Sequence, residues 1–258
     1  MLLAVDVGNT QTHIGIFSSE QIVAEWRTST EPRRTADELA LIFQEFLSFQ
    51  DLSFSRQVTG VVISSVVPSL TGAMREMVEK YFHFDPVVVE AGIKTGMPVL
   101  TDNPREVGAD RIVNAVAAHA LAGGPLIVID FGTATTFDAV SEAGEYLGGA
   151  IAPGVTISAR ALWDSAALIQ RVELVMPKSV IGRSTIESVR SGVLFGAVSL
   201  VEGMVERMKK ELGGTAEVIA TGGLAPLVLS ECSIQARHEP ALTLAGLRIL
   251  YERNVEPN

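Results

Sequence analysis

The sequence predicts an α/β protein of two similar halves, each a mixed sheet flanked by helices. The motif Asp6-Val-Gly-Asn-Thr10 ends the first apolar run, and Asp130-Phe-Gly-Thr-Ala-Thr-Thr136 ends another run 124 residues later. Each motif leads into two further strand-like runs, and strand-like and helix-like segments then alternate along the chain. A chain of 258 residues is long enough for two such domains. We expect them to cover residues 1–121 and 122–258.

The first half is expected to begin with an antiparallel meander of three strands, at 2–5, 13–17 and 22–26. A helix at 35–49 follows, with Thr35 as N-cap and Glu38 at the third helical position. The remaining expected elements are a strand at 60–65, a helix from Pro68 to about 82, a strand at 86–89, a helical turn with Asn103, Pro104 and Glu106 as N-cap, first and third positions, and a helix from about 112.

The second half repeats the start of the first. An offset of 124 residues aligns Gly132 with Gly8 and Thr136 with Thr12, so the correspondence between the halves extends beyond the first strand. The expected elements are strands at 126–129 and 136–140, a glycine-rich stretch from Tyr146, helices at about 157–168 and 185–212, a strand at 217–220 and a C-terminal helix from about 241.

Composition narrows the classes of partner and compartment. The net charge of −10, with no basic or aromatic stripe, argues against nucleic acid. The single cysteine, Cys232, favours a reducing compartment and argues against a cysteine-ligated metal. The N-terminus lacks the pattern of a signal peptide, and the longest membrane-like segment, 112–129, contains the breaker Gly123-Gly-Pro125. We therefore expect a cytoplasmic protein without a membrane partner.

The two aspartate motifs are the main functional signal. A strand end followed by Asx, Gly and Thr is also typical of an ordinary hairpin turn, which is the better interpretation of one copy alone. A carboxylate after a buried strand is costly unless it meets a cation or several donors, so two in equivalent places indicate a shared ligand. Glycine and hydroxyl groups can surround phosphate, and a carboxylate can hold a cation. Two such loops facing each other would form a nucleotide cleft.

Two further segments fit this hypothesis. The strand 217–220 runs into Gly222-Gly223 and a helix, which is either a tight connection or a place where the backbone approaches adenosine. In Gly108-Ala-Asp-Arg111, Asp110 is either a helix cap or the carboxylate that accepts the proton of an attacking hydroxyl. The adjacent Arg111 could then hold an acidic substrate bidentately. The four histidines have no metal-ligand spacing.

These motifs, together with Gly148-Gly-Ala-Ile-Ala-Pro-Gly154, make the chain resemble type III pantothenate kinase over nearly its whole length. The family belongs to the actin, hexokinase and Hsp70 superfamily. The resemblance therefore implies two ribonuclease-H-like domains around an ATP cleft. It implies ATP-dependent phosphorylation of pantothenate to 4′-phosphopantothenate, the first step of coenzyme A biosynthesis, with Mg²⁺ and a monovalent cation, K⁺ or NH₄⁺.

The resemblance also implies roles for individual residues. Asp110 would be the general base, Gly108 to Arg111 and Thr185 would bind pantothenate, and Asp130 would help hold the monovalent cation. A second subunit would help complete the pocket at Thr185, so a homodimer is expected. The residues implied to contact ATP are Asp6, Val7, Gly8, Asn9, Thr10, Gln11, Thr12, His13 and Thr133, with Asp6 near the Mg-ATP phosphates.

One departure and two rival functions accompany this hypothesis. Thr101 stands where many members carry an aromatic residue, so the resemblance implies a pantothenate pocket that lacks this aromatic contact on one wall. A sugar kinase fits the glycine loops alone, but not the loop with Asp110 and Arg111. A regulatory protein that binds without turnover is the other rival, and the presence of Asp6, Asp110 and Asp130 together argues for catalysis.

Overall fold

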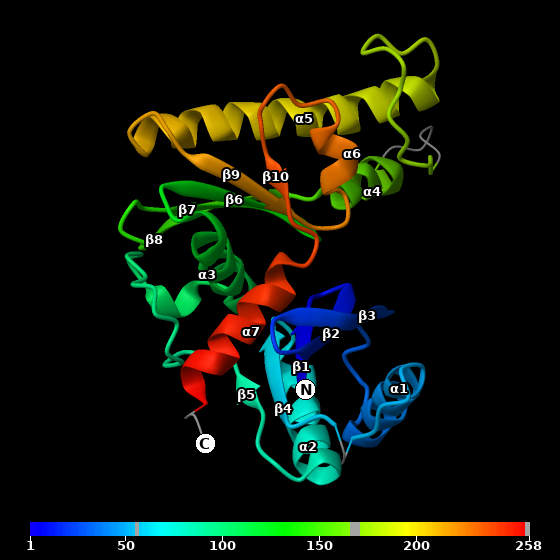
Figure 1. Cartoon of the computed structure of the whole chain (residues 1–258). Helices are drawn as coiled ribbons and strands as arrows, with labels where there is room; N and C mark the ends of the chain where they lie inside the picture. Colours follow the sequence, from blue (N-terminus) through cyan, green and yellow to red (C-terminus); the bar gives the residue numbers. More distant parts are fainter. Residues whose placement is uncertain (55–56, 166–170, 256–258) are drawn as a thin grey trace. The chain divides into compact units, whose positions relative to one another are not determined.

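The chain folds into two compact units, each with its own five-stranded sheet. The computed structural model describes residues 1–54, 57–165 and 171–255. Unit 1 consists of Met1–Pro98, Asp102–Ala117 and Ala241–Asn258, and unit 2 of Val99–Thr101 and Ala118–Pro240 (Figure 1). Both units have mixed sheets flanked by helices, as the sequence predicts.

Unit 1 begins with the expected meander. Its sheet has the order β3-β2-β1-β4-β5, antiparallel on the β2 side of β1 and parallel on the β4 side. Its elements are β1 (Leu2–Val7), β2 (Gln11–Ser18), β3 (Gln21–Ser29), α1 (Ala36–Ser48), β4 (Gly60–Ser65), α2 (Pro68–Phe82), β5 (Val87–Val88), the 3-10 turn Pro104–Glu106, the first part of α3 (Ala109–Ala122) and α7 (Leu242–Asn254).

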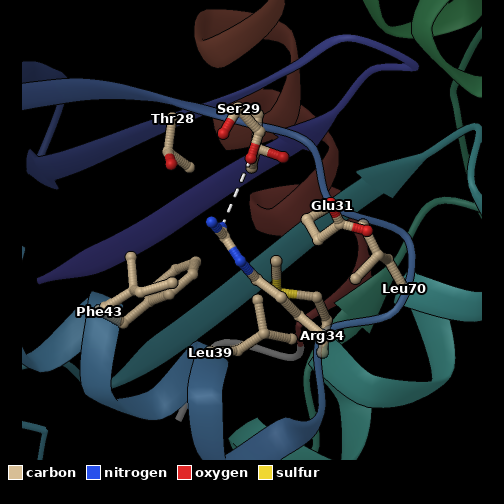
Figure 2. Close-up of a pocket in the computed structure, with 10 residues that line it drawn as sticks. Thr28, Ser29, Glu31, Arg34, Leu39, Phe43 and Leu70 are labelled. Carbon is tan, nitrogen blue, oxygen red and sulfur yellow. Dashed lines mark hydrogen bonds between the residues drawn. The ribbon is translucent and has the colours of Figure 1, made fainter.

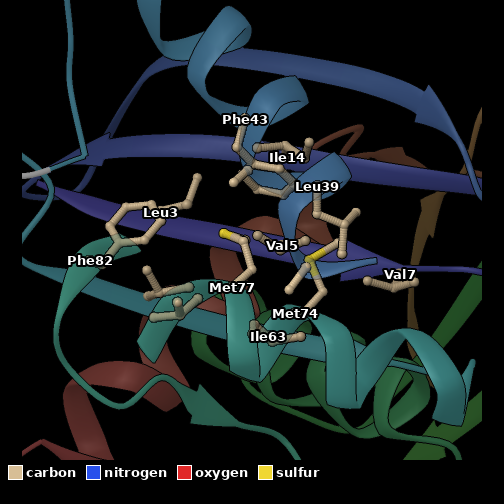
Figure 3. Close-up of a cluster of buried hydrophobic side chains, with 14 of the residues drawn as sticks. Leu3, Val5, Val7, Ile14, Leu39, Phe43, Ile63, Met74, Met77 and Phe82 are labelled. Atoms are coloured by element: carbon tan, nitrogen blue, oxygen red, sulfur yellow. The ribbon is translucent and has the colours of Figure 1, made fainter. Parts of the chain in front are cut away.

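Helices α1 and α2 cover one face of this sheet. Leu3, Val5 and Val7 of β1 alternate inward and meet Phe43 of α1 and Met74 of α2 in one fully buried cluster (Figure 3). Burying side chains of this size contributes about 1.5–3 kcal/mol each. Because side chains alternate between the two faces of a strand, the other residues of β1, Asp6 among them, lie on the opposite face.

Helix α7 covers part of that opposite face. A Cβ at Gly15 of β2 would lie 2.7 Å from Leu244, and a Cβ at Gly60 of β4 would lie 2.0 Å from Tyr251. The C-terminal segment 241–258, expected in the second domain, therefore belongs to unit 1. The predicted boundary at 121 and 122 and the division between the units both fall within α3.

Unit 2 repeats the strand order, β8-β7-β6-β9-β10, with the same senses of pairing. Its elements are β6 (Leu126–Phe131), β7 (Ala134–Val140), β8 (Tyr146–Pro153), α4 (Val155–Ser165), α5 (Thr185–Glu211), β9 (Glu217–Thr221), α6 (Ala225–Leu229) and β10 (Arg237–His238). The glycine-rich stretch after Tyr146 is thus a strand, and β10 is an addition to the expected elements. The end of the expected helix 157–168 lies outside the described residues.

The strand registers contradict one predicted correspondence between residues of the two halves. Thr12 lies opposite Val7, whereas Phe131, the equivalent of Val7, lies opposite Thr135. The prediction that Thr136 corresponds to Thr12 is therefore wrong. The second hairpin turn is one residue shorter than the first, so the constant offset ends at the turn.

The long helix α5 crosses one face of the second sheet with α4 and α6 (Figure 1). It is long and apolar enough to span a membrane by length and composition alone, and 39% of that window is buried. Val193, Leu194, Val198 and Val201 pack in the core of unit 2, so α5 has the contacts of a core helix. The segment 112–129 is a helix, a turn and a strand, as predicted.

Candidate functional site

The first predicted phosphate loop joins β1 to β2 at the carboxyl end of β1. The Gly8 N–H donates to the Gln11 carbonyl at 3.1 Å, which closes the turn. Asn9, Thr10 and Gln11 are exposed, and Val7 is buried in the core. The loop therefore presents amide, hydroxyl and backbone groups to solvent, which are donors suited to phosphate.

Asp6 lies in a polar row across the sheet. His13 of β2 is directly opposite Asp6 on one side and Ser64 of β4 on the other, so all three side chains share a face. Ser64 is fully buried, and its hydroxyl has no hydrogen-bond partner among the described residues. The His13 Nε2 lies 3.2 Å from Glu25 Oε2. Burial, with the charge of Arg27, lowers the pKa of His13 despite Glu25, so we expect a neutral imidazole.

A residue outside the predicted set holds this loop in shape. Thr30 follows β3, its Oγ1 donates to the Gly8 carbonyl at 2.7 Å, and its N–H donates to the Thr10 carbonyl at 3.0 Å. The hydroxyls of Thr30 and Thr12 are 3.0 Å apart. Thr12, predicted to contact ATP, is therefore buried beneath the loop on the helix face. A lone threonine at a strand end carries no sequence signal for such contacts.

The second loop has the same place in unit 2. Asp130 lies between Thr136 of β7 and Thr221 of β9, as Asp6 lies between His13 and Ser64. The Gly132 N–H donates to the Ala134 carbonyl at 3.0 Å, and Thr133 is exposed. The equivalent positions of the two aspartates, read from the motif, are thus confirmed.

Two glycines from other predicted motifs lie against this second loop. A Cβ at Gly154 would lie 2.3 Å from the Thr133 carbonyl oxygen, and one at Gly222 would lie 2.6 Å from Phe131 backbone atoms. Gly222 also has a φ of +96°, which favours glycine. The structure therefore brings together the three glycine-containing segments that the sequence singled out in this half.

Asp110 lies in the first turn of α3, within unit 1. Its Oδ1 accepts the Arg111 N–H at 2.9 Å, and a Cβ at Gly108 would lie 2.6 Å from the same oxygen. Burial raises the pKa of Asp110, partly offset by the N–H and the charge of Arg111. Asp110 does bond to the helix start, as the capping interpretation allows. The raised pKa of Asp110 is also closer to neutral pH, where a general base is expected to work.

Helix α3 is tied to the sheet that carries Asp6. One turn after Asp110, the buried Asn114 accepts a hydrogen bond from Thr243 Oγ1 of α7 at 2.7 Å. A Cβ at Gly246 of α7 would lie 2.3 Å from the Val113 carbonyl oxygen, so the two helices cross closely. Since α7 also packs on β1, β2 and β4, unit 1 holds Asp6 and Asp110 in one packed framework.

Thr185, the remaining predicted substrate residue, is the first residue of α5. Ser184 caps this helix by accepting the Glu187 N–H at 3.2 Å, which leaves the exposed Thr185 side chain outside the capping interaction. In the described part of the chain, no three His, Cys, Asp or Glu side chains come together as a metal site would require. Any cation held here would need hydroxyl, carbonyl, water or phosphate oxygens as well.

Two cavities lie near these loops, one in each unit. The first, beside Thr12, has a volume of about 10 Å³ and is lined by Thr28, Ser29 and Arg34, among others (Figure 2). It is too small for a nucleotide. The second, of about 340 Å³, lies between α4 and α5 and includes Gly192 and Gly196 of α5. Its lining is mainly apolar, which suits a hydrophobic partner better than phosphate.

Comparison with known sequences gives a consistent result. Residues 2–207 match the family model described as type III pantothenate kinase. A type III pantothenate kinase from Streptomyces griseus is 54% identical over 262 residues, covering 99% of both chains. One from Moorella thermoacetica is 52% identical over 254 residues, covering 98% of this chain and 100% of its own.

Solved structures support the fold. A Campylobacter jejuni protein provisionally assigned to the Baf family of transcriptional activators aligns with a TM-score of 0.61 at 15% identity, covering 98% of each chain. Component A of the (R)-2-hydroxyglutaryl-CoA dehydratase of Acidaminococcus fermentans aligns with a TM-score of 0.57 at 15% identity, covering 97% of this chain and 96% of its own. At such identities the likeness concerns the fold alone.

Proposed function

The chain belongs to the type III pantothenate kinase family, kinases that phosphorylate an alcohol group, and we propose that Asp110 is the general base of this reaction. The observation that carries the proposal is the environment of Asp110. Its carboxylate is held at the start of α3, beside an arginine, with a pKa raised by burial. A carboxylate so placed fits the task of accepting the proton of an attacking hydroxyl.

The proposed reaction has one chemical step. The primary hydroxyl oxygen of pantothenate attacks the γ-phosphorus of ATP, its proton passes to Asp110, and ADP leaves with the electrons of the broken P–O bond. Arg111 is suited to pair with the carboxylate of pantothenate, because a guanidinium binds a carboxylate bidentately. Gly108, Ala109 and Thr185 complete the proposed pantothenate contacts.

The two aspartate loops are proposed to bind ATP and its cations. Asp6 and the exposed groups of Asn9, Thr10 and Gln11 suit Mg-ATP phosphates, and Thr133 offers a hydroxyl from the second loop. The side-chain atoms that could bind a cation at both loops are oxygens, which are the ligands that the hard cations Mg²⁺ and K⁺ prefer. When bound, these cations would neutralise phosphate charge. We assign the monovalent cation to Asp130.

A homodimer in the cytoplasm completes the proposal. Just before α5, Val180 and Ile181 are 64% and 82% exposed, and the Val180 carbonyl accepts a hydrogen bond from Ser191 of α5. This apolar segment precedes Thr185 by a few residues, and the apolar cavity between α4 and α5 is a second apolar feature of unit 2. We propose that a second copy covers both, because exposed apolar clusters of this kind typically mark association sites.

The test is formation of 4′-phosphopantothenate by purified protein with ATP, Mg²⁺ and pantothenate, with and without K⁺. We expect product, and more of it with K⁺. Absence of product with all components present would overturn the proposal in favour of a protein that binds without turnover. A panel of hexoses in the same assay tests the sugar-kinase alternative. Loss of K⁺ stimulation in Asp130→Asn, with residual turnover, would support the cation assignment, and unchanged stimulation would contradict it.

A further inference from the structure

We propose that Thr30 is a positioning residue that fixes the Gly8–Thr10 loop in the shape that binds ATP phosphates. The inference rests on the proposed ATP role of that loop. Thr30 has no proposed contact with ATP itself. It acts through the two carbonyls that it holds, those of Gly8 and Thr10.

The geometry of the peptide bond explains how these two contacts orient the loop. In a trans peptide the C=O and the following N–H point in opposite directions. Since Thr30 Oγ1 holds the Gly8 carbonyl, the N–H of Asn9 points away from Thr30. Since the Thr30 N–H holds the Thr10 carbonyl, the N–H of Gln11 also points away. The N–H groups of Asn9 and Gln11 are thus each directed away from a Thr30 contact, and neighbouring N–H groups held in this way can bind an anion.

Thr30 is itself held in place by the segment that follows β3. The Arg34 guanidinium donates to the Ser29 carbonyl at 3.4 Å, as Figure 2 shows, and Ser69 of α2 donates to the Pro32 carbonyl at 3.0 Å. The capping box of Thr35 and Glu38 then begins α1. The two contacts of Thr30 with the loop are therefore made by a residue with little freedom to move.

Unit 2 provides an independent comparison at the equivalent position. Ser29 of β3 lies opposite Gln11 of β2, and Pro153 of β8 lies opposite Ala134 of β7, so Gly154 corresponds to Thr30. Gly154 lies so close to the second loop that a Cβ would be 2.7 Å from the Gly132 carbonyl oxygen. Both units thus contact the loop after the aspartate from this position, unit 2 by close backbone approach and unit 1 by a hydroxyl and a backbone N–H.

The experiment compares Thr30→Val, which keeps the shape but removes the hydroxyl, with Thr30→Ser, which keeps the hydroxyl. The matched control is Thr28→Val, two residues earlier on the same face of β3, where the described residues give the hydroxyl no hydrogen bond. For each variant we would measure the Kd of a non-hydrolysable ATP analogue with Mg²⁺, the KM values for ATP and pantothenate, kcat, and the Tm. Hydrogen exchange at Asn9 and Gln11 would report on the loop directly.

We expect Thr30→Val to weaken binding of the analogue and raise the KM for ATP about 3- to 10-fold, the range for one hydrogen bond, with the KM for pantothenate unchanged. Thr30→Ser should restore ATP binding, and Thr28→Val should match wild type. Wild-type ATP affinity in Thr30→Val would overturn the inference alone. Failure of the wild-type protein to bind the analogue would overturn the proposed function together with it. If Thr30→Val does not fold, Thr30→Ala takes its place with the same expected results.

Discussion

At the residue scale, Asp110 combines two opposing demands on one carboxyl group. A general base must be ionised when the hydroxyl attacks, yet burial at this position disfavours the ionised form. The balance brings its pKa closer to the working pH, which suits proton transfer. The same balance predicts that catalysis and stability respond in opposite directions when the charge is removed.

The catalytic prediction is that Asp110→Asn lowers kcat by roughly 10²–10⁴-fold, the usual contribution of a general base. Because Asp110 makes its hydrogen bonds at the start of α3, we expect the Kd of an ATP analogue to stay near the wild-type value. Isothermal titration and initial-rate assays on the same preparation would check both. Wild-type turnover in the variant would show that another residue is the general base.

The stability prediction concerns pH. Since the pKa of Asp110 is raised in the folded chain, the folded state holds this proton more tightly than the unfolded state does. The associated stability is present below the ordinary Asp pKa of about 3.9 and is lost as the pH rises through the raised value. We therefore expect Asp110→Asn to have a higher Tm than wild type at pH 7. The difference should shrink as the pH falls toward about 4, and a constant difference would contradict this account.

Gly108 illustrates how a neighbouring residue can act on the same group. In Gly108→Ala the new Cβ would lie 2.6 Å from Asp110 Oδ1, so the carboxylate must move. We expect kcat to fall with little change in ATP affinity. The control is the same substitution in the Asp110→Asn background: if the added methyl group acts through the carboxylate, it should lower the remaining rate little further. Equal effects in both backgrounds would indicate that the methyl group damages the loop itself.

At the element scale, the crossing of α7 and α3 determines how unit 1 is held together. Gly246 allows α7 to approach the Val113 carbonyl, and Thr243 bonds to Asn114 one turn away. The contact with a backbone atom cannot be relieved by a change of rotamer. The small residue at 246 is therefore required by packing.

The corresponding prediction is that Gly246→Ala lowers the free energy of unfolding by about 1–3 kcal/mol, the usual cost of overpacking. The matched control is Gly72→Ala in α2, where a Cβ meets nothing within 4 Å. There the higher helix propensity of alanine should raise stability by about 0.5–1 kcal/mol. Urea denaturation would measure both, and changes of the same sign would contradict the packing argument.

The sequence contains the signals for most of these elements. Capping residues Thr35 and Ser184, the proline that begins α2, and the apolar runs that end at Asp6 and Asp130 act locally, so their effects can be predicted from neighbouring residues. The support of the first loop by Thr30 and the membership of α7 in unit 1 depend on partners distant in sequence. The shorter turn between β6 and β7 could not be predicted, because threonines stand at both 135 and 136 and either could match Thr12.

At the scale of the whole molecule, association of two chains is the main prediction. We expect Ile181→Glu to convert a dimer to a monomer, because a charge at this 82% exposed side chain opposes burial in an apolar interface. The KM for pantothenate should rise if the second subunit completes the pocket near Thr185. Light scattering over a range of concentrations, with Val255→Glu in unit 1 as a control, would check this. If the Ile181→Glu variant remains a dimer with an unchanged KM for pantothenate, the interface lies elsewhere.

The position of α7 in unit 1 also bears on how the chain is made. A ribosome synthesises every residue of unit 2 before it reaches segment 241–258, which unit 1 needs to cover one face of its sheet. Domains generally fold as units during synthesis, so the unit whose strands emerge first is the last to become complete. A nascent chain that stalls before Leu242 would therefore carry a complete second unit beside a first unit with an uncovered sheet, a surface that chaperones recognise.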